Sequence, residues 1–218
     1  RNYEKSFSVM APDGTGKTTF LTQLLNRLAF LYVDAPNNTG RFHLYHFRPS
    51  LFPNLGEVGE KARIMKQDTD FTNPHRAKPA GLVSSLIRIT YYWMDYVLGW
   101  MYYTRRDVQY DLYTVYDRYS YDLLVDPRRT RLKLPYWVRR CFVACMPHPK
   151  INFFLKASPD VIIKRKAELT HNEITRQVSA YERLSVRKNI ITIDANKCVD
   201  EMVDEALPHL LSAYWEKL

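Results

Sequence analysis

The chain has 218 residues, enough for one well-filled α/β core, and we expect a single domain over residues 1–218. Hydrophobic residues make up 46% and charged residues 25%, a balance that excludes intrinsic disorder. The formal charge of +9 fits a protein that handles polyanions, but it does not choose among nucleotides, nucleic acid and anionic membranes.

Strand and helix signals alternate along the chain, with no internal repeat and no low-complexity linker. Short apolar or alternating segments, which are typical of strands, occur at 6–11, 42–47, 112–116, 151–155 and 190–193. Apolar residues recur at helical spacing over 17–31, 82–100, 136–145, 159–169, 173–187 and 199–218. Five strands with helices between them predict a parallel sheet that is covered by helices on both faces.

Two stretches differ from this regular pattern. Residues 48–80 are rich in Pro, Asn, Asp and Thr, so we expect an irregular insertion on the substrate side, whose role stays open. The predicted helix at 82–100 has two faces. One is an apolar stripe of Leu82, Leu86, Ile89, Trp93, Val97 and Trp100, and the other holds Arg88, Tyr92 and Asp95. The second face is also compatible with a merely polar surface that carries a local ion pair.

Several features exclude other classes of protein. The apolar run 82–103 is interrupted by Arg88 and Asp95 and therefore does not predict a membrane span. No signal peptide is recognisable, and we expect a cytoplasmic protein, whether or not the chain is a domain of a longer one. The cysteines lack the paired spacing of a zinc site, and we expect the two on a predicted helix to be buried thiols. The three cysteines of the chain are Cys141, Cys145 and Cys198, and the first two lie on the predicted helix 136–145.

The strongest chemical signal is the segment 11–18, Ala-Pro-Asp-Gly-Thr-Gly-Lys-Thr, which lies between the first predicted strand and the first predicted helix. This context is the one that a P-loop requires. Glycines allow a tight turn whose backbone N–H groups face a phosphate chain, and the helix N-terminus adds partial positive charge. Lys17 then reaches the β and γ phosphates, and Thr18 supplies an oxygen to Mg²⁺. Ala11 stands where the consensus has glycine, which requires strand-like backbone angles there.

A P-loop predicts a bound nucleoside triphosphate but does not name the reaction. The candidate for guanine recognition, Asn-Lys-Cys-Val at 196–199, lacks the carboxylate needed at its fourth position. We therefore do not expect a GTPase. The chain also lacks the long C-terminal architecture of a motor or transporter ATPase.

Several segments resemble the thymidylate kinase family of nucleoside monophosphate kinases. They are the P-loop at 12–19, Tyr-Asp-Arg-Tyr at 116–119, the strand and helix from 153 to 165, Tyr-Glu-Arg-Leu at 181–184 and Ile-Asp-Ala at 193–195. The resemblance implies the three-layer fold of P-loop NTPases, with a five-stranded parallel sheet and a helical lid at about 165–177. It also implies an ATP-dependent kinase that uses Mg²⁺ as its cofactor.

The resemblance assigns residues to a donor side and an acceptor side. ATP would be bound by Asp13, Gly14, Thr15, Gly16, Lys17, Thr18, Thr19 and Arg165, with magnesium at Thr18 and Asp117. The catalytic residues would be Lys17, Asp117, Arg118 and Arg165. The acceptor would be bound by Asp13, Arg48, Arg88, Tyr92 and Arg118. From the residues alone, two alternatives stay open: Asp117-Arg118 as a surface ion pair, and the basic residues around Arg165 as a solvated helix end.

The acceptor is where this sequence departs from the family. After Asp-Arg-Tyr the family continues with an Ala-Tyr-Gln segment that helps read thymine, whereas this chain has Ser-Tyr-Asp-Leu-Leu-Val-Asp-Pro at 120–127. Three functions stay open. They are a kinase of a dTMP-like nucleoside monophosphate, a kinase of another metabolite such as a sugar or nucleoside, and a nucleotide-dependent module that binds polyanions. Nucleic acid is not favoured, since the dense basic patch 128–133 stands alone. A homodimer and the role of the sixteen tyrosines also stay open.

Overall fold

The computed structural model describes residues 5–33, 42–53, 81–110, 112–166 and 169–215. Most of the predicted insertion, 54–80, therefore lies outside the described residues, as do residues 167–168 of the predicted lid. The chain divides into two compact units. The first unit contains residues 5–47, 104–119 and 149–215, and the second contains 48–103 and 120–148. That the units act together as one domain stays a prediction.

The first unit is built on a parallel sheet that has five strands in the described part of the chain. The strands are β1 (Ser6–Met10), β2 (Phe42–His46), β3 (Tyr113–Asp117), β4 (Ile151–Lys156) and β5 (Ile190–Asp194), in the spatial order β2-β3-β1-β4-β5. The chain leaves β1 toward one edge of the sheet and leaves β4 toward the other. In open parallel sheets, ligands bind outside the carboxyl ends of the strands at such a reversal. The predicted α/β class and parallel sheet are confirmed.

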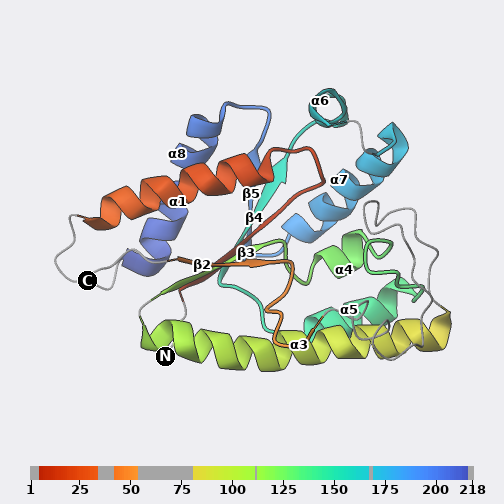
Figure 1. Ribbon diagram of the computed structural model, residues 1–218. Coiled ribbons are helices and arrows are strands. Elements are labelled where there is room, and N and C mark those ends of the chain that lie inside the picture. Colours follow the sequence, from red (N-terminus) through yellow and green to blue (C-terminus); the bar gives the residue numbers. More distant parts are fainter. Residues whose placement is uncertain (1–4, 34–41, 54–80, 111, 167–168, 216–218) are drawn as a thin grey trace. The chain divides into compact units, whose positions relative to one another are not determined.

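Helices cover both faces of this sheet. They are α1 (Lys17–Val33), α6 (Pro159–Arg165), α7 (His171–Ser185) and α8 (Val199–Trp215). Phe153 of β4 packs edge to face against Phe20 of α1, with ring centroids 6.3 Å apart. The next residue, Phe154, stacks on Tyr181 of α7 at 5.2 Å. Successive strand residues point to opposite faces, so α1 and α7 lie on opposite sides of the sheet (Figure 1).

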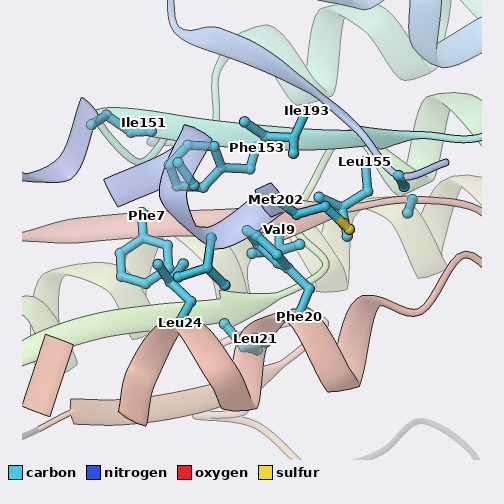
Figure 2. Packing of buried hydrophobic residues seen from close by; sticks show 14 of the residues in the cluster. Phe7, Val9, Phe20, Leu21, Leu24, Ile151, Phe153, Leu155, Ile193 and Met202 are labelled. Atoms are coloured by element: carbon cyan, nitrogen blue, oxygen red, sulfur yellow. The ribbon is translucent and has the colours of Figure 1, made fainter. Parts of the chain in front are cut away.

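The core of the first unit is aliphatic and aromatic. Figure 2 shows Phe7, Val9 and Phe153 from the sheet together with Phe20 and Leu24 from α1. All five side chains are fully buried. Burial of each such side chain contributes about 1.5–3 kcal/mol to folding, which fixes the position of β1 and α1 and of the loop that joins them.

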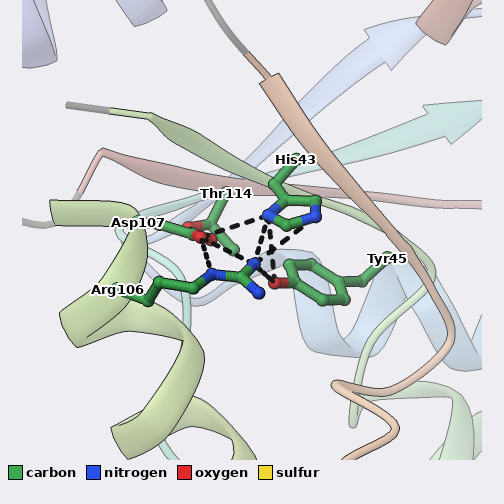
Figure 3. Close-up of polar contacts among 5 residues, drawn as sticks. All are labelled: His43, Tyr45, Arg106, Asp107 and Thr114. Atoms are coloured by element: carbon green, nitrogen blue, oxygen red, sulfur yellow. Dashed lines mark hydrogen bonds and ion pairs between the residues drawn. The ribbon is translucent and has the colours of Figure 1, made fainter. Parts of the chain in front are cut away.

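A long helix, α3 (Leu82–Gln109), runs from the second unit into the first. Its C-terminal end is held against β2 and β3 by a polar cluster (Figure 3). Asp107 is buried and accepts a hydrogen bond from Thr114 Oγ1 at 2.8 Å, and its other oxygen lies 3.1 Å from His43 Nδ1. Arg106 Nη2 donates to Tyr45 Oη at 2.9 Å. The cluster satisfies a buried carboxylate at the edge of the sheet.

The predicted apolar stripe of α3 was wrong at its N-terminal end. Leu82 is 61% exposed and Leu86 is 47% exposed. The buried face keeps Ile89 of that stripe, and its other members are Ser85, Asp95, Tyr96 and Gly99. Apolar residues lie on every side of this helix, so their spacing does not select the face that packs.

The rest of the second unit, as far as it is described, contains two short helices, α4 (Asp122–Val125) and α5 (Tyr136–Ala144). The sequence predicted α5 but not α4. The prediction of buried thiols was wrong, because Cys141 and Cys145 are exposed. The buried side of α5 is formed by Arg139 and Val143. Val143 is two positions from each cysteine, which places the cysteines on the opposite face of the helix. Across the described residues, no helix combines the length and apolarity that crossing a bilayer requires.

Candidate functional site

Residues 11–16 form a tight loop between the end of β1 and the start of α1. Gly14 has φ +87° and Gly16 has φ +92°, values that residues with side chains rarely adopt. Thr15 closes the turn, because its Oγ1 donates to Pro12 O at 2.9 Å. Ala11 is not among the residues with positive φ, so its methyl group causes no strain of that kind where the consensus has glycine. The loop follows the carboxyl end of the central strand, where parallel sheets bind ligands.

The end of α6 packs against this loop. A methyl group on Gly14 would lie 3.0 Å from Lys166 Cβ and 3.3 Å from Ile162. Arg165 Nη1 donates to Thr15 O and to Ala195 O, both at 3.1 Å. The predicted donor-side residue Arg165 therefore links the loop after β1 to the chain after β5. Arg176, farther along the predicted lid, is exposed and pairs with Glu173.

Lys17 and Asp117 form an ion pair between the start of α1 and the end of β3. Lys17 Nζ lies 3.1 Å from Asp117 Oδ1, and Lys17 is only 9% exposed. His46, the last residue of β2, pairs with Asp117 in the sheet register, and its Nδ1 lies 3.0 Å from Asp117 Oδ2. Burial alone would raise the pKa of Asp117, but the hydrogen bond from His46 and the charge of Lys17 together lower it to about 2. Asp117 is therefore ionised at neutral pH.

Arg118, directly after β3, has an unusual backbone. Its φ is +73°, although its N–H still extends the sheet by donating to Val9 O at 2.9 Å. Its side chain is 3% exposed and donates through Nη2 to Asp13 Oδ1. Asp117 and Arg118 thus pair with Lys17 and Asp13 respectively, and the alternative of a surface pair between the two neighbours does not hold. Non-glycine residues in this region are strained and cluster at functional sites.

The arrangement brings two cations and two carboxylates to the loop at 11–16. Asp13, Lys17, Asp117 and Arg118 all lie at the carboxyl ends of β1 and β3, while Thr18 and Thr19 are exposed on the first turn of α1. Such a site can exchange its internal ion pairs for a polyphosphate and a cation.

A magnesium ion fits the donor set at this loop. The Thr18 hydroxyl and the Asp117 carboxylate are hard oxygen ligands, and Mg²⁺ in nucleotide sites takes one or two protein ligands beside phosphates and water. Among the described residues, no group of three or more His, Cys, Asp or Glu could hold a metal by itself.

Three predicted acceptor residues belong to the second unit. Arg48 is buried and donates through Nη1 to Asp95 Oδ2 at 2.7 Å, and its guanidinium lies over the Tyr92 ring, 6.0 Å from the centroid. The N–H groups of Ser50 and Phe52 also donate to Asp95. The interpretation of Asp95 as part of an exposed polar face was therefore wrong.

Arg88, the remaining predicted acceptor residue, is half-buried on α3. Its Nε is buried and has no hydrogen-bond acceptor among the described residues. A buried guanidinium N–H without an acceptor costs about 1–3 kcal/mol, so its position calls for a ligand or an ordered water.

Sequence reasoning missed His46 and Asp95. For His46 the sequence shows a polar residue near the end of a predicted strand, but the strand register that brings it to Asp117 is seen only in the structure. For Asp95 there was no signal, because its partner Arg48 is 47 residues away in the sequence. In comparisons with known proteins, no family model matches the chain and no curated sequence matches it.

Proposed function

We propose that the chain is an ATP-dependent kinase that transfers the γ-phosphoryl group to a nucleoside monophosphate, with dTMP as the reference acceptor. The observation that supports it best is the Lys17–Asp117 ion pair beneath a glycine loop at the carboxyl end of β1. Phosphoryl transfer needs little covalent chemistry from the protein, and its catalysis consists mainly of positioning and charge neutralisation.

On the donor side, residues 11–19 would act as a P-loop. The N–H groups at the start of α1 would face the phosphate chain, and Lys17 would move from Asp117 to the β and γ phosphates. Thr18 and Asp117 would hold magnesium, which when bound neutralises charge on the phosphate oxygens. Because Asp117 stays ionised at neutral pH, it can hold a cation without first losing a proton.

On the acceptor side, Arg118 and Asp13 would face the reacting group. The Arg118 guanidinium is held by Asp13, so a limited adjustment would present it to a phosphate. Its strained backbone supports a role for the side chain, because glycine would occupy that position at lower cost.

A second candidate function is a kinase of another small metabolite. In the family that the sequence resembles, the segment after Asp-Arg-Tyr helps read the base. Here residues 120–125 are buried, with exposed fractions of 5% or less. A segment that is packed into the second unit cannot serve as an open base-reading surface, which favours an acceptor other than dTMP.

The experiment that tests both candidates is transfer of labelled γ-phosphate from Mg·ATP to a panel of acceptors. The panel contains dTMP, dUMP, the other nucleoside monophosphates, nucleosides and simple sugars, with Lys17→Ala as the negative control. Transfer to a monophosphate supports the first function, and transfer to a nucleoside or sugar alone supports the second. Absence of transfer to every acceptor, with ATP bound, would contradict the kinase proposal.

A further inference from the structure

The dense basic patch at 128–133 belongs to the second unit and lies between α4 and α5 in the sequence. It contains Arg128, Arg129, Arg131 and Lys133. Thr130 and Leu132, which alternate with three of these residues, are buried. The buried pair anchors the segment, while Arg128 and Lys133 are exposed and the other two arginines are half-buried.

The segment is held in one conformation by its own backbone. Leu132 N donates to Pro127 O at 2.8 Å, and Arg131 N donates to Arg128 O at 2.9 Å. Below it, the guanidinium of Arg139 donates to the carbonyls of Leu123 and Leu124 at 2.8 and 2.9 Å. A cationic segment fixed in this way loses little conformational entropy when it binds an anion.

Arg131 has φ +55°, in the left-handed region. Asparagine or glycine would adopt this angle at lower cost. Arg118 is the other arginine among the described residues with this backbone strain. Strain of this kind is retained where the side chain itself is needed, and it occurs most often at ligand sites.

The segment also meets α3 close to Arg88. Lys133 N donates to Ser85 Oγ at 2.9 Å, and Arg88 lies one helical turn beyond Ser85. The buried Arg88 Nε has no acceptor among the described residues. This independently indicates that an anion or a water accepts a hydrogen bond from Arg88.

We propose that segment 126–133 and Arg88 form a binding site in the second unit for a small organic phosphate. Besides Arg88, the site contains Arg128, Arg129, Arg131 and Lys133, and the acidic residue within segment 126–133 is Asp126. Asp126 Oδ2 lies 3.7 Å from Arg129 Nε and helps orient that guanidinium. Four arginines favour a phosphate or diphosphate group, because the guanidinium fork binds two phosphate oxygens at once.

The compact shape of the segment favours a small molecule over nucleic acid. A single-strand site needs a basic groove with stacking aromatic residues along several nucleotides, whereas these cations occupy one closed turn and the adjacent turn of α3. The inference goes beyond the proposed function, in which Asp13 and Arg118 face the reacting group, because it assigns a phosphate site to other residues, all of them in the second unit. Phosphate binding at this site does not depend on the kinase proposal.

The test is calorimetric titration with pyrophosphate, dTMP and a hexose phosphate, in the presence of a saturating non-hydrolysable Mg·ATP analogue. The variant Arg128→Ala/Arg131→Gly removes two cations and keeps the turn, because glycine adopts the positive φ of residue 131 without strain. We expect an affinity loss of about tenfold or more, because two charge-assisted contacts to the phosphate are removed. Arg140→Ala, an exposed residue of α5, is the matched control and should bind normally.

Unchanged affinity in the double variant, or an equal loss in Arg140→Ala, would overturn the site. Tighter binding of single-stranded DNA than of any small phosphate, with a steep salt dependence, would overturn the ligand class. If the ATP analogue does not bind at all, the donor-site proposal fails, while the titrations still test the segment.

Discussion

Lys17 Nζ lies 3.1 Å from Asp117 Oδ1, which joins the first residue of α1 to the last residue of β3. The two residues are 100 positions apart in the sequence and meet because β1 and β3 are neighbours in a parallel sheet. In the proposed function, Lys17 would bind the phosphates of the nucleotide and Asp117 would hold magnesium. Without a ligand, the two side chains neutralise each other's charge. This pair gives the first prediction.

Asp117 should make the stability of the protein dependent on pH in the acid range. Its pKa falls from 3.8 to about 2 on folding, so its contribution is complete above about pH 4 and is lost as the pH falls toward 2. The shift corresponds to about 2 kcal/mol. Urea unfolding should show that Asp117→Asn lowers the free energy of unfolding at pH 5 and has little effect near pH 2. A difference that is independent of pH would contradict the assigned pKa.

Replacement of Arg118 should separate the role of its side chain from that of its backbone. Both Arg118→Ala and Arg118→Gly remove the guanidinium that Asp13 binds, but only glycine suits φ +73°. We expect Arg118→Gly to be more stable than Arg118→Ala by about 1 kcal/mol. Thermal unfolding measures this difference.

The same two variants test the acceptor assignment. Both should weaken the response to the acceptor more than the response to ATP, measured by KM for each substrate. Equal loss of ATP affinity in both would place Arg118 on the donor side instead.

A methyl group on Gly14 should disturb the loop at 11–16. The substitution Gly14→Ala meets φ +87° as well as Lys166 Cβ at 3.0 Å, so we expect destabilisation of about 1–3 kcal/mol and loss of nucleotide binding. Gly81→Ala is the control, because no atom lies within 4 Å of the added carbon. Chemical denaturation and a fluorescent ATP analogue measure the two effects. Normal nucleotide binding by Gly14→Ala would show that the loop does not contact phosphates.

Breaking the Arg48–Asp95 pair should strongly destabilise the second unit. Asp95 is fully buried, and removing its cation leaves a buried charge whose remaining hydrogen-bond donors among the described residues are the N–H groups of Ser50 and Phe52. We expect Arg48→Ala to cost about 3–5 kcal/mol. Arg27→Ala, which breaks an exposed ion pair with Asp200 and Asp204, should cost less than about 1 kcal/mol. If both variants lost a similar, small free energy of unfolding, Arg48 would not be needed for stability, and the sequence-based assignment of Arg48 to acceptor binding would be supported.

The strands and most helices could be predicted because each is a local pattern. Val, Ile and Phe recur in short runs in β1, β4 and β5, and Leu recurs at helical spacing in α1. Gly14, Gly16 and Lys17 could be placed in one loop for the same reason, since the motif is contiguous. In β1, the loop at 11–16 and α1, the local sequence pattern matches the observed secondary structure.

What the sequence could not predict depends on contacts between distant segments. Leu82 and Leu86 have the spacing of a buried stripe, yet both are exposed. The buried face of α3 is rotated from that stripe, because Asp95 is bound by Arg48 and Ser85 by the backbone of Lys133. The short helix α4 is four residues long, too short to show periodicity. Likewise, the contact of His46 with Asp117 follows from strand register, which a single sequence does not reveal.

The most direct test of the central claim is the affinity of the protein for Mg·ATP, measured by calorimetry for the wild type and for Lys17→Met. Methionine keeps the unbranched side chain but has no ammonium. The account predicts one ATP bound per chain in the presence of magnesium, and at least a tenfold weaker affinity in the variant, as expected for the loss of a charge-assisted contact. Equal affinity in both proteins, or no binding by the wild type, would contradict it.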